Sequence, residues 1–226
     1  MSGGVPGPIL AIDAGSPRVS VAVGDAERML AEAGEERERS SAALLALVDA
    51  ILRAAGLRPG DLAGVVALRG PGSFTGLRVG LATALGLHQA LGLPAMGLPT
   101  LEILAGLGPG DGSTVVAAVD ALRGDWFAQA FRSAEPPAPL GEPRLLPAAG
   151  LRELAGSGGS DSDPNVIAGF GVGEVAGLAG PGIRLLEPPA LAGPTVRHAA
   201  RWALDWDPST LVAPLYLRPP SARPSG

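Results

Sequence analysis

The sequence predicts an α/β protein. Residues 64–68 form a short apolar run that leads into a glycine-rich loop and then into an apolar helix, an order typical of α/β proteins. Strands followed by a helix occur once in each half of the chain. At 226 residues the chain is long enough to bury a hydrophobic core without disulfides.

A Gly-Pro-Gly-Asp-Gly loop at 108–112 marks the boundary between the halves. We therefore expect an N-terminal half at 1–108 and a C-terminal half at 109–217, whose last helix is free to pack back on the first half. The tail at 218–226 is expected to be disordered. The C-terminal half is predicted to contain strands at 114–120 and 125–131, a final helix at 195–205 and an extended segment at 211–217.

The composition excludes several classes of site and partner. The chain has no Cys, which excludes disulfides, zinc–thiolate sites and a Cys nucleophile. All 17 basic residues are Arg and the net charge is -5, so the chain is a poor candidate for gripping nucleic acid by itself. No run of 18 apolar residues and no signal-peptide start occur, so we expect a cytoplasmic protein that does not enter a membrane.

The first turn of the chain carries a candidate phosphate site. An apolar strand at 9–13 ends in Asp13, and a returning strand follows at 19–23. Between them, Gly15 and Ser16 could offer backbone N–H groups to phosphate, while Asp13 holds a magnesium-bound water. The alternative is a plain Asx or Ser turn that serves only the hairpin.

The predicted helix that starts near Ser41 is apolar over a broad arc. The mixed-charge run at 35–39 is expected to be its solvated first turn. The arc is wider than one core contact needs, so part of it is predicted to face a partner. The predicted partner-facing residues are Leu44, Val48, Ile51 and Leu52.

The most distinctive stretch of the chain is the glycine loop at 69–80 with the helix that follows it to Leu91. Ser73 and Thr75 are candidate helix caps, and Gly92 is a candidate C-terminal cap. The loop suits either an anion held at the helix N-terminus or a structural strand-to-helix turn. Small residues four apart on the helix would let another element approach closely. The predicted loop and interface residues are Gly70, Gly72, Ser73, Thr75, Gly76, Arg78, Gly80 and Ala84.

Several kinds of catalytic motif are missing from the sequence. His88 and His198 are the only histidines and form no ligand-spaced cluster with carboxylates, so no metal site is predicted. No Walker loop occurs because the chain has no Lys, and the Gly-x-Ser-x-Gly pattern of serine hydrolases is absent. With the loop's phosphate role weakened, we interpret it as fold and interface architecture first and as a ligand site second.

Four segments, in this order, resemble the bacterial TsaB (YeaZ) family over nearly the whole chain. They are Ile-Leu-Ala-Ile-Asp-Ala-Gly-Ser at 9–16, Arg-Gly-Pro-Gly-Ser-Phe-Thr-Gly-Leu-Arg-Val-Gly at 69–80, Ala-Val-Asp-Ala-Leu-Arg-Gly at 118–124 and Pro-Leu-Tyr-Leu-Arg at 214–218. The resemblance implies the actin/Hsp70/sugar-kinase type of fold, with two related α/β halves facing a cleft. It also implies that Asp13, Gly15 and Ser16 lie where active relatives bind nucleotide phosphates.

The resemblance further implies a role in making N6-threonylcarbamoyladenosine at position 37 of tRNA. The family member is the non-catalytic partner of TsaD and also pairs with TsaE, forms a homodimer when alone, and reaches tRNA only through the complex. Catalytic relatives carry His-x-x-x-His, whose positions fall here on Thr100 and Leu104, so the metal site is expected to be lost. No cofactor is firmly implied, and ATP or ADP is a candidate ligand at the interface of the complex.

Two other functions remain open from the sequence. An enzyme of the same fold could hydrolyse ATP or phosphorylate a small molecule, with Asp13 on the magnesium side. A metallopeptidase is contradicted by the missing histidine pair. The subunit of the tRNA-modifying complex, without catalysis of its own, is the interpretation we carry forward.

Overall fold

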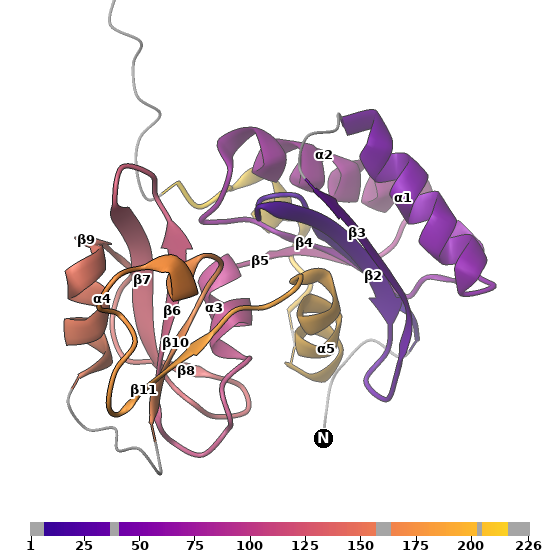
Figure 1. The fold of residues 1–226 in the computed structure, drawn as a ribbon. Coiled ribbons are helices and arrows are strands. Elements are labelled where there is room, and N and C mark those ends of the chain that lie inside the picture. Colours follow the sequence, from indigo (N-terminus) through magenta and orange to yellow (C-terminus); the bar gives the residue numbers. More distant parts are fainter. Residues whose placement is uncertain (1–6, 37–40, 157–163, 203–204, 217–226) are drawn as a thin grey trace, which may run out of the picture.

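The computed structural model describes residues 7–36, 41–156, 164–202 and 205–216, so the tail predicted at 218–226 lies outside the described residues. Two β-sheets stand side by side, each with helices against it (Figure 1). This arrangement confirms the predicted α/β class. None of the helices in the described ranges is both long and apolar enough to span a bilayer.

The first sheet has the strand order β3-β2-β1-β4-β5. Its first three strands are antiparallel, and β1, β4 and β5 run parallel. The strands are β1 (Ile9–Asp13), β2 (Arg18–Gly24), β3 (Met29–Glu36), β4 (Gly64–Leu68) and β5 (Ala95–Leu98). The associated helices are α1 (Ser41–Ala54), α2 (Phe74–Leu91) and α3 (Thr100–Ala105).

The second sheet has the order β11-β10-β6-β7-β8, and β9 also pairs with β7. Its strands are β6 (Thr114–Asp120), β7 (Asp125–Arg132), β8 (Ala138–Pro139), β9 (Arg144–Pro147), β10 (Asn165–Ala168) and β11 (Ile183–Leu186). Its helix α4 (Ala148–Ala155) covers one face, and α5 (Ala192–Trp202) follows β11. Short 3₁₀ turns occur at Pro59–Asp61, Val172–Glu174 and Pro208–Val212.

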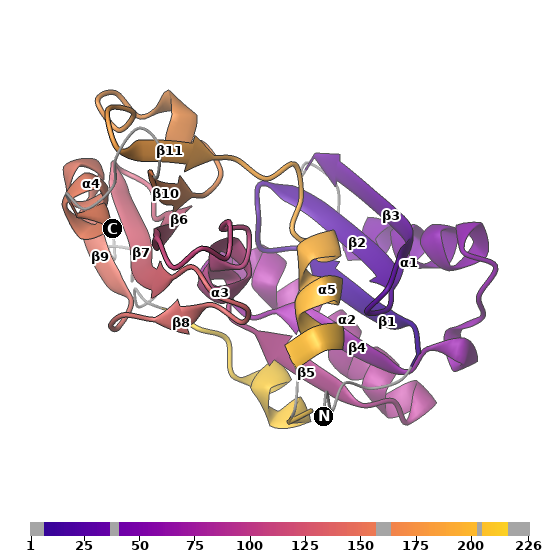
Figure 2. The same ribbon diagram turned by 90° about the horizontal axis from the view of Figure 1, so that it is seen from below.

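The first sheet is buried on both faces, which explains why β1 and β4 read as continuous apolar runs. Leu10 and Ile12 point toward α1 and α2, whereas Ile9 and Ala11 point to the other face, where α5 lies. Figure 2 shows α5 lying across this sheet. The last helix of the chain therefore packs on the sheet formed by the first residues of the chain.

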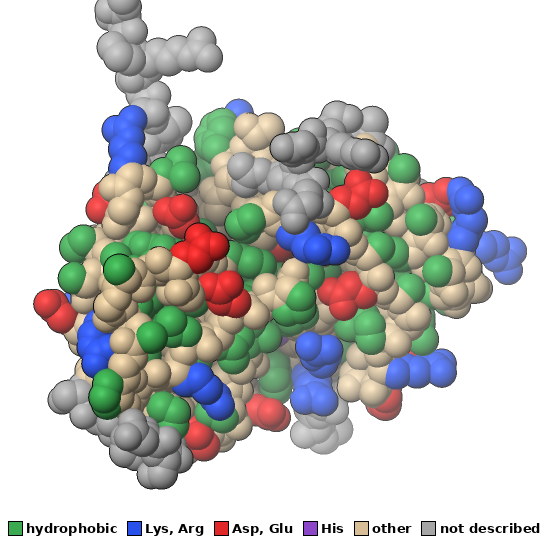
Figure 3. All heavy atoms as spheres, in the orientation of Figure 1, with side chains coloured by type: hydrophobic (Ala, Val, Ile, Leu, Met, Phe, Trp, Pro, Cys, Tyr) green, Lys and Arg blue, Asp and Glu red, His purple; other side chains and the backbone are tan. Residues whose placement is uncertain are grey.

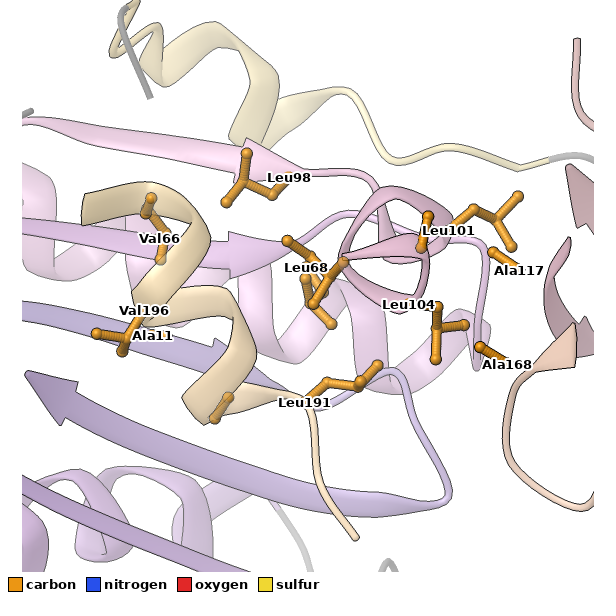
Figure 4. Close-up of a cluster of buried hydrophobic side chains, with 14 of the residues drawn as sticks. Ala11, Val66, Leu68, Leu98, Leu101, Leu104, Ala117, Ala168, Leu191 and Val196 are labelled. Carbon is orange, nitrogen blue, oxygen red and sulfur yellow. The ribbon is translucent and has the colours of Figure 1, made fainter. Parts of the chain in front are cut away.

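One hydrophobic cluster joins the two sheets. It contains Leu68 from β4, Leu101 and Leu104 from α3, Leu191 directly before α5 and Val196 within α5 (Figure 4). Because α3 rests on β6 while α5 rests on β1 and β2, this cluster spans the junction between the halves. It holds the two sheets in one continuous core.

Some predicted element boundaries are wrong. Glu35 and Glu36 do not belong to the first turn of α1, because β3 extends to Glu36 and pairs with β2 as far as Arg18, and the rest of the run at 35–39 lies outside the described residues. The segment predicted as extended at 211–217 begins inside the 3₁₀ turn Pro208–Val212, which Asp207 caps by accepting from Ser209 N. The final helix starts at Ala192, earlier than predicted, because Ser20 and Glu32 accept the N–H groups of Ala192 and Gly193.

Candidate functional site

The turn after β1 is closed on itself by the carboxylate of Asp13. Its Oδ1 accepts hydrogen bonds from the backbone N–H groups of Gly15, at 3.0 Å, and of Ser16, at 3.1 Å. Asp13 has no exposed surface and Ser16 is 6% exposed. The N–H groups that a nucleotide phosphate would need are thus already bonded within the turn.

Asp13 is an unusual carboxyl group because it is completely buried and forms no ion pair with any residue that the structure describes. Burial is the main cause that raises its pKa from 3.8 to about 6, and hydrogen bonds from Ser16 and Gly15 oppose this shift. Its second oxygen, Oδ2, has no hydrogen-bond partner among the described residues. A carboxyl that is costly to ionise and shielded from solvent is poorly placed to hold a hydrated magnesium ion.

The glycine loop packs directly over this turn. The backbone N–H of Ser73 donates to the carbonyl oxygen of Gly15 at 2.8 Å. A Cβ at Gly72 would lie 2.8 Å from the same oxygen, and a Cβ at Gly76 would overlap the carbonyl oxygen of Ala14. These glycines are therefore required by a close backbone approach within the chain.

The first turn of α2 is capped as the sequence indicates. The Ser73 hydroxyl accepts from the N–H of Gly76 at 3.3 Å, while Thr75 is exposed and makes no cap. Gly92 ends the helix in the left-handed conformation, with its N–H bonded to the carbonyl of His88. Both caps are local features, which the sequence predicts correctly.

The predicted small-residue stripe faces inward, so it is not an interface. A Cβ at Gly80 would lie 3.3 Å from the Cβ of Ala14, and Ala84 is completely buried. Gly76 and Gly80 let α2 approach the Asp13 turn of its own chain, and Ala84 lies in the core beneath the helix. The prediction of an intermolecular contact by this stripe is wrong because the first sheet already occupies it.

The predicted partner-facing row on α1 also faces the protein's own core. Its four side chains are 3–4% exposed and pack against the first sheet in the cluster shared with α2. They cannot offer a surface to another chain, so this prediction is corrected. The corrected residues are Leu44, Val48, Ile51 and Leu52.

Gly70 and Arg78 contact the C-terminal segment of the chain. Gly70 has a φ of +108°, and a Cβ there would lie 2.9 Å from the carbonyl oxygen of Leu215. The N–H of Leu215 donates to the carbonyl of Arg69 at 2.7 Å, and Nε of Arg78 donates to the hydroxyl of Tyr216 at 3.2 Å. The segment at 213–216 thus runs along the glycine loop, an arrangement that local sequence patterns do not indicate.

The two positions that the resemblance aligns with metal-binding histidines hold side chains that are packed into the protein core. Thr100 is 4% exposed and Leu104 is completely buried in the cluster between the sheets. Among the described residues, no group of three or more Asp, Glu or His side chains could hold a metal ion. The donor set present therefore does not fit a metal at this place.

Sequence reasoning missed one pair beside these positions. Nε2 of His198 on α5 lies 3.1 Å from Oε1 of Glu102 on α3, and His198 also packs edge-on against Trp202. The two partners come from different halves of the chain, so no spacing rule could have joined them. Asp120, the carboxylate that ends β6, is exposed and caps its own hairpin by accepting from Leu122 N at 2.7 Å.

Comparisons with known proteins agree with the family resemblance that the sequence motifs indicate. The family model of TsaD, tRNA N6-adenosine threonylcarbamoyltransferase, matches residues 35–135. An uncharacterized protein of Mycobacterium tuberculosis is 31% identical, covering 96% of this chain and 94% of its own length. The tRNA threonylcarbamoyladenosine biosynthesis protein TsaB of Escherichia coli is 36% identical, covering 53% of this chain and 52% of its own. The chain belongs to the TsaB (YeaZ) family.

Solved structures support the fold expected for the TsaB family. YeaZ from Pseudomonas aeruginosa superposes with a TM-score of 0.74 at 24% identity, covering 93% of this chain and all of that one. Component A of (R)-2-hydroxyglutaryl-CoA dehydratase from Acidaminococcus fermentans has a TM-score of 0.54 at 12% identity. The match covers 86% of this chain and 96% of that one. The likeness to both structures confirms the predicted actin-like fold with two related α/β halves.

Proposed function

We propose that this TsaB-family chain is a non-catalytic subunit of the machinery that makes N6-threonylcarbamoyladenosine in tRNA, and that it pairs with a TsaD-type subunit. The proposal rests on one observation: the chain's own residues fill the two places where active relatives would bind nucleotide phosphate and metal. The Asp13 turn is buried and bonded to itself, and the core occupies the Thr100 and Leu104 positions. A chain that keeps the fold but closes these two places serves the assembly through its surface.

The surface proposed for the partner is the outward face of α1 and α2. These helices lie side by side on one face of the first sheet (Figure 1). Leu45 on α1 is 55% exposed, and the helices carry exposed small side chains at four-residue spacing. The exposed small residues are Ala46, Ala50 and Ala54 on α1 and Ala82, Gly86 and Ala90 on α2. Two such rows permit close approach of a partner helix without steric obstruction.

Direct recognition of tRNA by this chain is not part of the proposal. The chain has a net charge of -5, and on the face shown in Figure 3 its basic side chains are scattered among acidic and apolar ones. We propose that tRNA is reached through the complex, that TsaE joins the same assembly, and that ATP or ADP binds at the interface of the complex. The free chain is proposed to pair with itself through the same helices, in the cytoplasm.

The alternative function, an ATP-hydrolysing or small-molecule kinase enzyme, has less support. It needs Asp13 accessible to a hydrated magnesium ion, whereas this carboxyl has no exposed surface. It also needs backbone donors for phosphate, and those of Gly15 and Ser16 are bonded to Asp13. No feature of the described site favours this activity over the subunit role.

Co-purification with the TsaD-type subunit of the same organism tests the proposal. The wild-type chain should elute with that subunit as one complex in size-exclusion chromatography with light scattering. Leu45→Glu should weaken the complex, because it places a charge in an apolar contact. The matched control is Leu140→Glu, a 49% exposed leucine on the other half. A wild-type chain that elutes alone would refute the function, whereas equal effects of both variants would refute only the surface.

A further inference from the structure

Three side chains form a compact cluster on the outside of the first turn of α2, here called the Phe74 patch. The Phe74 and Tyr216 ring centroids lie 5.0 Å apart. The guanidinium of Arg78 lies 4.1 Å from the centre of the Phe74 ring, and its Nε donates to the Tyr216 hydroxyl at 3.2 Å. Stacking and the hydrogen bond together fix the orientation of the arginine before any partner arrives.

The fold itself does not account for the exposed rings of this patch. Phe74 is 39% exposed and Tyr216 is 36% exposed, and neither belongs to a hydrophobic core cluster of the described residues. The helix cap and the close packing of the loop are provided by Ser73 and Gly76. An aromatic pair held at the surface beside an arginine has the composition of an interface core, where Phe, Tyr and Arg are enriched.

Arg78 has unused hydrogen-bonding capacity that defines its partner. Only its Nε is engaged, and the two terminal amino groups make no hydrogen bond or ion pair with any residue that the structure describes. A guanidinium with its terminal N–H groups free matches the two oxygens of a carboxylate. Aromatic rings on one side would shield such a pair from water, which strengthens it.

We propose that the Phe74 patch receives an aspartate or glutamate side chain from the TsaD-type partner subunit, with apolar neighbours of that residue packing on the two rings. This inference rests on the proposed function. The patch adjoins the outward face of α1 and α2, because Arg78 precedes the exposed Ala82 by one turn of the same helix. The carboxylate would fix the register of the two subunits along α2.

A protein carboxylate fits this patch better than the phosphates of a nucleic acid. Gripping a nucleic-acid backbone takes several basic side chains, whereas Arg78 is the only charged member of the patch. The overall charge of -5 would further oppose a polyanion. Arginine is instead enriched at protein interfaces, where close pairs of opposite charge set the orientation of the partners.

Binding measurements with Arg78 variants test the patch. Calorimetric titration of the purified TsaD-type subunit should show that Arg78→Gln weakens binding about tenfold or more, as expected for a lost charge-assisted pair. Arg78→Lys keeps the charge but not the planar fork, so it should restore only part of the affinity. Tyr216→Phe, which frees Nε, should have a smaller effect. The control is Arg144→Gln, which removes an exposed arginine on β9 and should not change binding.

The outcomes separate the patch from the function. If the wild-type chain binds and Arg78→Gln and Phe74→Ala bind equally well, the patch is refuted and the proposed function stands. If Arg78→Gln weakens only self-association and leaves the complex unchanged, the occupant is a second copy of this chain and the inference is wrong. If the wild-type chain does not bind the TsaD-type subunit, both proposals fall. Unchanged thermal unfolding of each variant excludes a folding defect.

Discussion

Nε2 of His198 lies 3.1 Å from a carboxylate oxygen of Glu102, and this pair connects the two halves of the molecule. Glu102 belongs to α3, which rests on the second sheet, and His198 belongs to α5, which rests on the first. The imidazole is almost completely buried, whereas the carboxylate reaches the surface. The contact therefore lies at the edge of the core that joins the sheets.

We predict that loss of this pair destabilises the junction between the halves. His198→Ala should lower the free energy of unfolding by about 2 kcal/mol, because it also removes the edge-on contact with Trp202. Glu102→Gln keeps a hydrogen-bond acceptor and should cost less, about 1 kcal/mol. Guanidinium unfolding measures both, with Glu142→Gln at an exposed position as the control. Equal stability of His198→Ala and wild type would show that the pair has no structural role.

Asp13→Asn should stabilise the protein at neutral pH. The folded-state pKa of Asp13 is about 6 against 3.8 for the unfolded chain, so the folded state holds the proton more tightly. The contribution of this group to stability is therefore greatest below about pH 4 and falls as the pH rises to about 6. A shift of this size corresponds to about 3 kcal/mol above pH 6. The neutral amide would recover part of it, because its NH2 group takes the place of the unpartnered Oδ2 and its donors stay unsatisfied.

The pH dependence provides the control for this substitution. The Asn oxygen can still accept from Gly15 and Ser16, so the turn should keep its geometry. Melting temperatures of wild type and variant should converge below pH 4 and diverge above pH 6. A variant that is less stable at pH 7 would show that the ionised carboxylate is stabilised by something other than the described contacts.

Two glycine-to-alanine substitutions on α2 should have opposite effects. Gly76→Ala places a Cβ on the carbonyl oxygen of Ala14, which is held in the closed turn, so it should destabilise the protein by several kcal/mol. Gly86→Ala meets no atom within 4 Å and should stabilise the helix by about 1 kcal/mol. Thermal unfolding of the two variants compares them on the same helix. Tolerance of Gly76→Ala would mean that the turn and the loop can separate.

The isolated chain should give no saturable heat on titration with Mg-ATP. The amides of Gly15 and Ser16 are bonded to Asp13, and no described cluster can hold the metal ion. Calorimetry at 25 °C is the direct measurement, repeated after addition of the TsaD-type subunit to detect a nucleotide at the interface. Saturable binding to the free chain that Asp13→Ala abolishes would support the kinase or ATPase alternative.

The sequence predicts best those features of the fold that depend on residues close together in the chain. The Ser73 cap, the Gly92 terminus and the buried strands follow from local hydrogen bonding and from apolar periodicity. The long motif at 69–80 also indicated the family correctly. For the two helix caps, the deciding contacts lie within a few residues along the chain.

The errors concern which side of an element meets which neighbour. The apolar arc of α1 and the small stripe on α2 were both assigned to a partner, because composition shows that a face is apolar or small but not what covers it. The first sheet covers both. The faces of α1 and α2 that stay exposed, with Leu45 and Gly86, are identified only by the tertiary structure, which shows where the sheet packs.

The sequence alone indicated the buried apolar strands, the Ser73 and Gly92 caps and the family, because neighbouring residues and motifs specify them. Tertiary structure decided the roles of the distinctive residues. It buried Asp13, turned Gly76 and Gly80 against their own chain, joined Glu102 to His198, and brought Tyr216 onto Arg78. These relationships arise from long-range packing, in which each face is assigned by the whole arrangement of sheets and helices rather than by its own residues.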